Sequence, residues 1–144
     1  MAHVFAISYG DAGVGKSTDA AATYPTALFI CRPGGMRPAS TFLGLPEAQV
    51  RTRTVRSLID VLTLLPQVKT AGYPAVVVDD VSLLAESLDT DLQQRYPGNK
   101  QNGVRYGDLR VAVGTYREQA RFADVDVVVL VGCGIVAFLR AFLW

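Results

Sequence analysis

The sequence passes abruptly from a short apolar run into a glycine-rich segment near its N-terminus. Residues 4–9 are mostly apolar and rich in β-formers, and residues 10–17 read Gly-Asp-Ala-Gly-Val-Gly-Lys-Ser. The second segment satisfies the pattern G-x-x-x-x-G-K-[ST]. This pattern belongs to a loop between a buried strand and the start of a helix, so it restricts the chain to folds that contain a strand–loop–helix unit.

The residue types of this loop suit the binding of a triphosphate. Its glycines let the backbone wrap closely around a phosphate, so that several N–H groups point at it beside the positive end of the next helix. We expect Lys16 to neutralise the β and γ oxygens, the Ser17 hydroxyl to bind Mg²⁺, and Thr18 to lie near the α-phosphate. The predicted ligands are ATP and Mg²⁺, and the predicted binding residues are Gly10, Asp11, Ala12, Gly13, Val14, Gly15, Lys16, Ser17 and Thr18.

Three further apolar runs predict buried strands. Residues 27–31 end at an Arg-Pro-Gly-Gly turn, residues 75–78 are a continuous Ala-Val-Val-Val run, and residues 127–131 are apolar throughout. A weaker extended segment is predicted around residues 48–55, where valine and threonine alternate with arginine.

Apolar positions at helical spacing predict helices between these strands. Ser57 is expected to cap the first helix, which Pro66 kinks or ends, and Ser82 is expected to cap the second. The third is expected to begin at Asp108, after a loop over residues 95–107. Strands that alternate with helices in this way predict an α/β fold with a mainly parallel sheet and helices on both faces.

Length and composition are those of one intracellular domain. The chain has 144 residues, half of them hydrophobic, and we predict a single domain over residues 1–144. Its net charge of +1 gives no general attraction to nucleic acid. The two cysteines lack the spacing of a metal knuckle or redox pair, and no export signal precedes the glycine-rich loop. These features favour a cytoplasmic protein with reduced thiols.

Two carboxylates follow the strand at residues 75–78. A triphosphate loop needs a carboxylate on a neighbouring strand to hold Mg²⁺ through its water shell, and Asp79 ends the only strand that offers one. The predicted metal residues are therefore Ser17 and Asp79. Asp80 either orients an attacking water or only begins the next turn, and it is our candidate catalytic residue together with Lys16.

With these motifs the sequence resembles the RecA-like P-loop ATPases of bacteriophages, including those proposed to act in single-strand annealing and recombination. The similarity covers about residues 7–131 and is carried by residues 9–18, the turn at 32–35, and Val-Val-Val-Asp-Asp-Val-Ser-Leu-Leu at 76–84. Only the first segment is highly specific. The resemblance implies a P-loop NTPase fold, ATP binding, a homo-oligomer whose neighbours complete each other's sites, and binding of single-stranded DNA. For a phage-encoded protein, the cytoplasm is that of the host cell.

The sequence departs from this family in two places. Relatives often have an acidic residue just before the Gly-Gly that follows the second strand, whereas this chain has Cys31-Arg32-Pro33, which predicts slow hydrolysis. After the strand that ends near Val131, relatives continue with a polar sensor residue and further strands, but here an apolar segment runs to Trp144. We therefore expect the C-terminal part to be curtailed. The chain would then be a fragment, have an altered end, or be a compact variant that lacks these elements.

Basic residues outnumber acidic ones in residues 95–121, where Tyr96 and Tyr106 also lie. Cationic segments with aromatic side chains suit single-stranded DNA, since charge follows the phosphates and rings stack on bases. The alternative is a solvated loop and helix face, and Lys100 or Arg105 as a finger toward a neighbour's γ-phosphate is a further option. The basic residues are Arg95, Lys100, Arg105, Arg110, Arg117 and Arg121.

The C-terminal segment 127–144 has only one charged residue, Arg140, and just reaches the length that spans a bilayer. The Gly-Cys-Gly at residues 132–134 divides it into a strand and a short apolar tail, so we predict no membrane insertion.

The sequence as a whole predicts an ATPase or ATP switch of phage DNA recombination or replication that acts on single-stranded DNA. A second hypothesis is a nucleotide-binding interaction module with little or no hydrolysis, which the Arg32-Pro33 departure favours. A small-molecule kinase ranks last, because no arginine-rich lid is evident.

Overall fold

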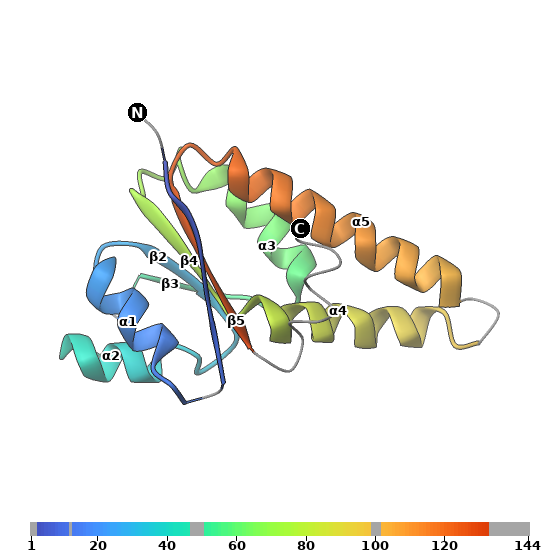
Figure 1. Ribbon diagram of the computed structural model, residues 1–144, viewed down its shortest axis with the longest axis horizontal. Helices are drawn as coiled ribbons and strands as arrows, with labels where there is room; N and C mark the ends of the chain where they lie inside the picture. Colours follow the sequence, from blue (N-terminus) through green and yellow to red (C-terminus); the bar gives the residue numbers. More distant parts are fainter. Residues whose placement is uncertain (1–2, 12, 47–50, 99–101, 133–144) are drawn as a thin grey trace.

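The computed structural model describes residues 3–11, 13–46, 51–98 and 102–132, which contain one five-stranded sheet (Figure 1). All strand pairs are parallel, and the order across the sheet is β1-β5-β4-β2-β3. The predicted parallel sheet is therefore confirmed. The ends of the four apolar strands are shifted by about one residue, and the weaker strand, predicted around residues 48–55, is Thr52–Thr54. The strands are β1 (Phe5–Gly10), β2 (Leu28–Cys31), β3 (Thr52–Thr54), β4 (Ala75–Asp79) and β5 (Asp126–Gly132).

Helices cover both faces of the sheet, as the alternating pattern predicted. Figure 1 shows α1 and α2 on one face and α3, α4 and α5 on the other. The chain moves across the sheet in one direction from β1 to β2 and β3 and then returns through β4 to β5, so crossovers of one hand place the two groups of helices on opposite faces. The helices are α1 (Lys16–Thr23), α2 (Arg37–Leu43), α3 (Leu58–Leu64) with the 3-10 turn η2 (Leu65–Gln67), α4 (Val81–Arg95) and α5 (Asn102–Arg121).

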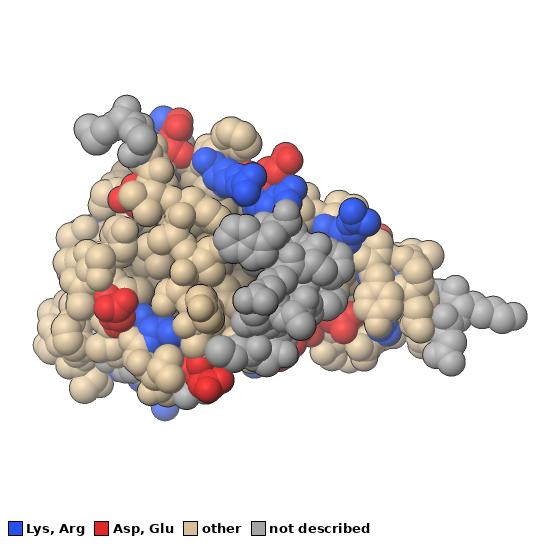
Figure 2. Space-filling view, viewed as in Figure 1, with Lys and Arg blue, Asp and Glu red and all other residues tan. Residues whose placement is uncertain are grey.

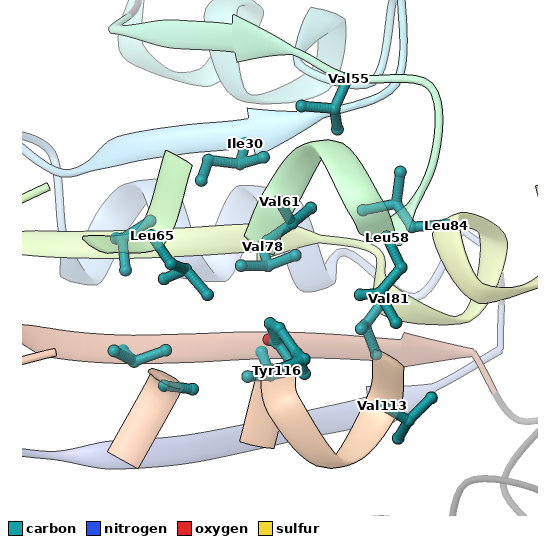
Figure 3. Close-up of a cluster of buried hydrophobic side chains, with 14 of the residues drawn as sticks. Ile30, Val55, Leu58, Val61, Leu65, Val78, Val81, Leu84, Val113 and Tyr116 are labelled. Atoms are coloured by element: carbon teal, nitrogen blue, oxygen red, sulfur yellow. The ribbon is translucent and has the colours of Figure 1, made fainter. Parts of the chain in front are cut away.

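The central strands are apolar on both sides because both sides are covered. Along β4, Val76 and Val78 pack under α3, α4 and α5, whereas Val77 packs toward α1 and α2. Strands buried on both faces read as continuous apolar runs, which is why periodicity alone located them. Figure 3 shows the larger cluster, in which side chains of the three helices meet the sheet at Ile30 and Val78, among them Leu58, Val61, Leu84, Val113 and Tyr116.

The structure contains the three helices that the apolar spacing predicted, but some of their predicted boundaries are wrong. Ser57 caps α3 in a capping box with Asp60, and Pro66 lies in the 3-10 turn that ends this helix, as expected. The predicted cap of α4 at Ser82 is wrong, because Asp80 caps it and accepts a hydrogen bond from Leu83 N at 2.8 Å. Both residue types cap helices well, and the end of β4 decides which one stands at the helix start.

The predicted loop over residues 95–107 is also corrected. Arg95 is the last residue of α4, and α5 begins at Asn102 rather than at Asp108. Gly103 and Gly107 weaken the local helical signal, which packing against α4 overrides. Helix α2 was not predicted, although a proline in its first turn and Gly44 at its end, with φ 65°, are the usual helix signals.

The apolar C-terminal run begins as a sheet strand. Residues 126–132 form β5, which lies between β1 and β4, and the remainder of the predicted tail, residues 133–144, lies outside the described residues. None of the helices in the described part of the chain is long and apolar enough to cross a membrane.

Tyr116 offers a test of the packing under α5. Its side chain is fully buried, and its hydroxyl has no hydrogen-bond partner among the described residues. Burial raises the pKa of the phenol, which stays neutral. We expect Tyr116→Phe to leave the free energy of unfolding unchanged or to raise it by about 1 kcal/mol, because it removes a desolvated polar group. Tyr116→Ala should lower it by about 3 to 5 kcal/mol.

Urea unfolding followed by circular dichroism measures both Tyr116 variants. A clear fall in the unfolding midpoint of Tyr116→Phe would contradict the prediction and would show that the hydroxyl has a partner.

Candidate functional site

The candidate site lies at the carboxyl edge of the sheet, where the described parallel strands end together. Gly10 at the end of β1 is in register with Gly132 of β5, and Cys31 of β2 is in register with Asp79 of β4. The loops that leave these strands therefore meet at one edge, which is where open α/β sheets bind their ligands.

The glycine-rich loop leaves β1 and returns to the sheet through α1. Gly13 and Gly15 have φ of 84° and 90°, and a Cβ at either position would meet nothing within 4 Å, so the space in front of the loop is open. A Cβ on Gly10 would lie 2.9 Å from Val14 Cγ2, so the loop folds back too closely for a side chain there. The loop thus has the shape of a cradle for a phosphate.

The start of α1 favours the same kind of ligand. Gly15 stands at the N-cap of this helix in the left-handed conformation, and no side chain caps the helix there. The first N–H groups of a helix need partners from outside it, and the helix dipole favours an anion at this end. The loop and helix together provide the donors that a phosphate requires.

Lys16 reaches back over the loop from the first position of α1. Its Nζ donates hydrogen bonds to Gly10 O at 2.7 Å and to Asp11 O at 2.9 Å. These two carbonyls hold the ammonium group over the cradle. A phosphate in the cradle would lie within reach of this charge, which fits the predicted role of Lys16.

The two predicted metal residues, 62 positions apart in the sequence, meet at the site. The Ser17 hydroxyl in the first turn of α1 donates a 2.5 Å hydrogen bond to Asp79 Oδ2 at the end of β4. Burial raises the pKa of the Asp79 carboxyl; the Ser17 hydrogen bond and the Lys16 charge oppose this rise, and the charge of Asp80 adds to it. A poorly hydrated carboxylate beside a hydroxyl is a suitable pair of oxygen ligands for a hard cation.

The composition of this pair indicates which cation fits. Within the described residues, no group of three His, Cys, Asp or Glu side chains could hold a metal ion. Mg²⁺ keeps most of its waters and takes only one or two protein oxygens beside those of a phosphate. Ser17 and Asp79 are compatible with this limited requirement, and Mg²⁺ binding by this pair stays a prediction.

Asp80 begins α4 next to the end of β5. The peptide bond between Asp79 and Asp80 is cis. The Oδ1 atom of Asp80 accepts the capping hydrogen bond from Leu83 N, while Oδ2 faces Gly132, where an added Cβ would lie 3.8 Å from it. One carboxylate oxygen is thus engaged in a structural role, and the catalytic role of Asp80 stays a prediction.

A contact that the sequence did not reveal fixes this corner. Gly132 N donates to the buried hydroxyl of Ser82 at 2.9 Å and so ties the end of β5 to the first turn of α4. The serine was visible in the sequence only as a candidate cap, and no local pattern indicates a partner fifty residues away.

The remaining predicted loop residues surround this centre. Asp11 and Val14 are exposed, Thr18 is half-buried in α1, and Ala12 lies outside the described residues. The Arg-Pro-Gly-Gly turn at residues 32–35 leaves the same edge of the sheet, beside Asp79 through the register of Cys31. It contributes no carboxylate.

Apart from Lys100, the basic residues predicted to bind DNA belong to α4 and α5, on the face of the sheet opposite α1 (Figure 1). Arg105 is mostly enclosed, because its Nε lies 3.4 Å from Asp89 Oδ1 and its guanidinium lies 4.6 Å from the centre of the Tyr106 ring. Lys100 lies outside the described residues. Arg105 is therefore held between the two helices and is not an extended finger.

A basic stripe remains on α5. Positions 106, 110, 117 and 121 fall on one face of a helix, because their spacings of four, seven and four residues follow the helical repeat. Of these side chains Tyr106, Arg110 and Arg121 are exposed. Figure 2 shows Lys and Arg gathered along the border of the molecule where α5 runs. We call positions 106, 110, 117 and 121 the α5 stripe.

The fold and the site define a class of protein. A parallel sheet whose first strand leads into a G-x-x-x-x-G-K-S loop, with a serine and a strand-end aspartate paired beside it, is the arrangement of P-loop NTPases. A model described as AAA domain matches residues 3–133, and the chain therefore belongs to this family of P-loop proteins. No match was found among curated proteins.

The family match bears on the sequence predictions only at a general level. Membership indicates a nucleotide-binding domain of ATPase type, which agrees with the P-loop part of the expected resemblance. The bacteriophage and recombination parts of that resemblance stay predictions.

Proposed function

We propose that this chain binds ATP with Mg²⁺ at the loop from Gly10 to Thr18 and hydrolyses it during DNA recombination or replication on single-stranded DNA. The observation that carries the proposal is the hydrogen bond between Ser17 and Asp79, which places a metal-binding pair beside a phosphate cradle. The proposal includes assembly into a homo-oligomer, as the resemblance implies. It also includes a location in the cytoplasm, which for a phage-encoded protein is that of the host cell.

Each residue has a defined task in this proposal. Backbone N–H groups of the loop and of α1 bind the β-phosphate, and Lys16 exchanges its bonds to the Gly10 and Asp11 carbonyls for bonds to β and γ oxygens. Ser17 and Asp79 would hold Mg²⁺, which supplies neutralisation of phosphate charge. The second oxygen of Asp80 is our candidate to orient a water.

A second candidate function has support from specific observations. The cap on α4 occupies one oxygen of Asp80, and the turn at residues 32–35 offers no other carboxylate. With weak activation of water, the chain would act as a nucleotide-binding interaction module that changes state on ATP binding and turns over slowly.

Phosphate release with and without a single-stranded oligonucleotide separates the two functions. The ATPase proposal expects turnover that requires Mg²⁺ and rises with DNA. ATP binding without turnover in either condition would favour the interaction module.

The α5 stripe gives the DNA part of the proposal a direct test. Arg110→Ala/Arg121→Ala should weaken oligonucleotide binding and reduce the salt slope by about 0.7 for each phosphate that the variant no longer neutralises. Tyr106→Ala should cost about 1 to 3 kcal/mol with an unchanged slope, since stacking is not a charge interaction. Fluorescence anisotropy at several salt concentrations measures both.

The control for the arginine pair is Arg53→Ala/Arg56→Ala, which removes two exposed arginines outside α5. Binding that weakens equally in the control and the stripe variant would show a general charge effect. No binding by the unmodified protein would remove DNA from the proposal.

A further inference from the structure

Strands β4 and β5 separate at the carboxyl edge of the sheet. Their pairing ends at Val78 and Val129, one residue before β4 ends and three residues before β5 ends. Beyond that point Asp79 still pairs with β2, while the last three residues of β5 still pair with β1. The two strand ends therefore diverge, and the chain enters α4 at the point of divergence.

Ser82 connects the two diverging strand ends. It lies in the first turn of α4, directly after β4, and its Oγ accepts the 2.9 Å hydrogen bond from Gly132 N at the end of β5. The residue is only 4% exposed. Serine is a weaker helix former than alanine, and a buried hydroxyl costs free energy unless it is hydrogen-bonded. What the hydroxyl provides at this position is therefore the bond to β5.

The carboxylate of Asp80 lies against the same corner. Its Oδ1 accepts the 2.8 Å hydrogen bond from Leu83 N, which fixes the orientation of the carboxylate. A Cβ built on Gly132 would lie 3.8 Å from Asp80 Oδ2 and 3.7 Å from Ser82 Oγ. Because position 132 is a glycine, no side chain of that residue stands in front of Oδ2.

Gly132 also adjoins the phosphate cradle. It is in register with Gly10, the first residue of the loop, on the neighbouring strand β1. Neighbouring strands are about 4.8 Å apart, and Lys16 Nζ lies 2.7 Å from Gly10 O. Position 132 therefore lies between Asp80 Oδ2 and the proposed place of the terminal phosphate. A water that hydrogen-bonds to both at about 2.8 Å would lie over this glycine.

We propose that Ser82 is a positioning residue for the attacking water in ATP hydrolysis, an inference that rests on the nucleotide function proposed above. By holding Gly132 N, Ser82 keeps the end of β5 at a fixed distance from the Asp80 carboxylate, so the water between Oδ2 and the γ-phosphate has one position. The water oxygen bonds to the γ-phosphorus while the bond from this phosphorus to the bridging oxygen breaks and ADP leaves. One water proton stays on the phosphate, and the other passes through Asp80 to solvent.

A purely structural role of this hydrogen bond predicts a different result. Loss of the hydroxyl would then lower the thermal midpoint and affect turnover and ATP affinity together, because the whole site would loosen. A positioning role lowers kcat and leaves Mg-ATP affinity nearly unchanged. Lys16 and the pair of Ser17 with Asp79 are held by hydrogen bonds that do not involve Ser82.

Three variants separate these roles. Ser82→Ala removes the bond to β5, and we expect kcat to fall about 10- to 100-fold while the dissociation constant for Mg-ATP stays within about twofold. Ser82→Thr keeps a hydroxyl and should restore most of the rate. Gly132→Ala keeps the N–H donor but places a methyl group in front of Asp80 Oδ2, so it should also lower kcat. Its Cβ would make only ordinary contacts, so the fold accepts it.

Single-turnover phosphate release measures the rate, and titration calorimetry measures the affinity. The matched controls are Ser87→Ala, which removes a hydroxyl that donates to Leu83 O within α4, and Gly107→Ala in α5, where an added Cβ meets nothing within 4 Å. Both should leave kcat and ATP affinity unchanged.

Amide hydrogen exchange in the nucleotide-free protein gives a readout without turnover. Measured by nuclear magnetic resonance, the amide of residue 132 should exchange slowly in the unmodified chain and in Gly132→Ala. In Ser82→Ala it should exchange about tenfold faster or more, because its described acceptor is lost.

The possible failures can be told apart. Turnover by the unmodified protein with an unchanged kcat in Ser82→Ala, or in Gly132→Ala if the serine variant unfolds, would overturn this inference and leave the proposed function standing. A loss of rate that comes with an equal loss of affinity, or that Ser82→Thr does not restore, would assign the bond to the fold. ATP binding without turnover in the unmodified protein would contradict the proposed hydrolysis itself, and the role of Ser82 with it.

Discussion

Lys16→Ala is expected to abolish Mg-ATP binding while the fold stays intact. The ammonium group lies over the phosphate cradle, and its only described hydrogen bonds are to the carbonyls of Gly10 and Asp11. Removing the Lys16 side chain leaves no buried hydrogen-bond partner unpaired and empties no position in the hydrophobic core. It takes away charge-assisted bonds worth about 3 kcal/mol or more together, which is at least about a hundredfold in affinity.

Titration calorimetry with Mg-ATP measures this loss, and circular dichroism checks the fold. The control is Lys69→Ala, which removes an exposed lysine paired with Asp124 at 2.7 Å and far along the sequence from the loop. An exposed ion pair contributes little, so this variant should bind ATP normally and unfold at nearly the same midpoint. Normal ATP affinity in Lys16→Ala would remove the assignment of the loop as a phosphate site.

The sheet could be predicted because its strands are local signals. Buried on both faces, β4 and β5 appear in the sequence as unbroken valine-rich runs, and turn residues mark their ends. The loop at residues 10–18 is likewise a local motif that needs close glycine spacing. Asp79 was found because a metal-binding carboxylate must end a strand, and few strands end in one.

Features that depend on distant contacts could not be predicted. The cap of α4 was assigned to Ser82, since the sequence does not show that α4 begins directly after β4, with Asp80 as its N-cap. Arg105 looked like a free cation in the sequence until α4 and α5 came together and paired it with Asp89. Helix α5 starts earlier than its glycines suggest, because packing on α4 outweighs local propensity.

The meeting of Ser17 with Asp79 combines both kinds of information. Each residue was chosen by local chemistry, but their contact depends on the order β1-β5-β4, which no local pattern specifies. Parallel strands bring their carboxyl ends to one edge whatever their order, so the two residues could be expected at the same edge although the strand order was unknown, and their role in binding Mg²⁺ stays a prediction.

Asp79→Asn is expected to change ligand binding and stability in opposite directions. The amide keeps the shape and can still accept the hydrogen bond from Ser17, but it loses the charge that attracts Mg²⁺. We expect the Mg²⁺ concentration for half-maximal ATP binding to rise about 10- to 100-fold, the range found for residues that support a metal site.

Stability without ligand should rise in the same variant. Burial raises the pKa of Asp79 in the folded state, so the ionised carboxylate opposes folding at a pH above that pKa. This opposition declines as the pH falls through the folded-state pKa and is gone below the lower pKa of the unfolded state. The neutral amide removes the opposition at neutral pH. The thermal midpoint of the ligand-free protein should therefore increase, while the further increase produced by Mg-ATP should shrink.

Asp124→Asn is the control with the opposite electrostatics. Its carboxylate is exposed, and the hydrogen bond and charge of Lys69 lower its pKa, so neutralising it should slightly lower the thermal midpoint and leave the Mg²⁺ titration unchanged. An unchanged titration in Asp79→Asn would assign the metal to another residue. A fall in its ligand-free midpoint would mean that the charge of Asp79 serves the fold, and the pairing with Ser17 would then be structural rather than a metal site.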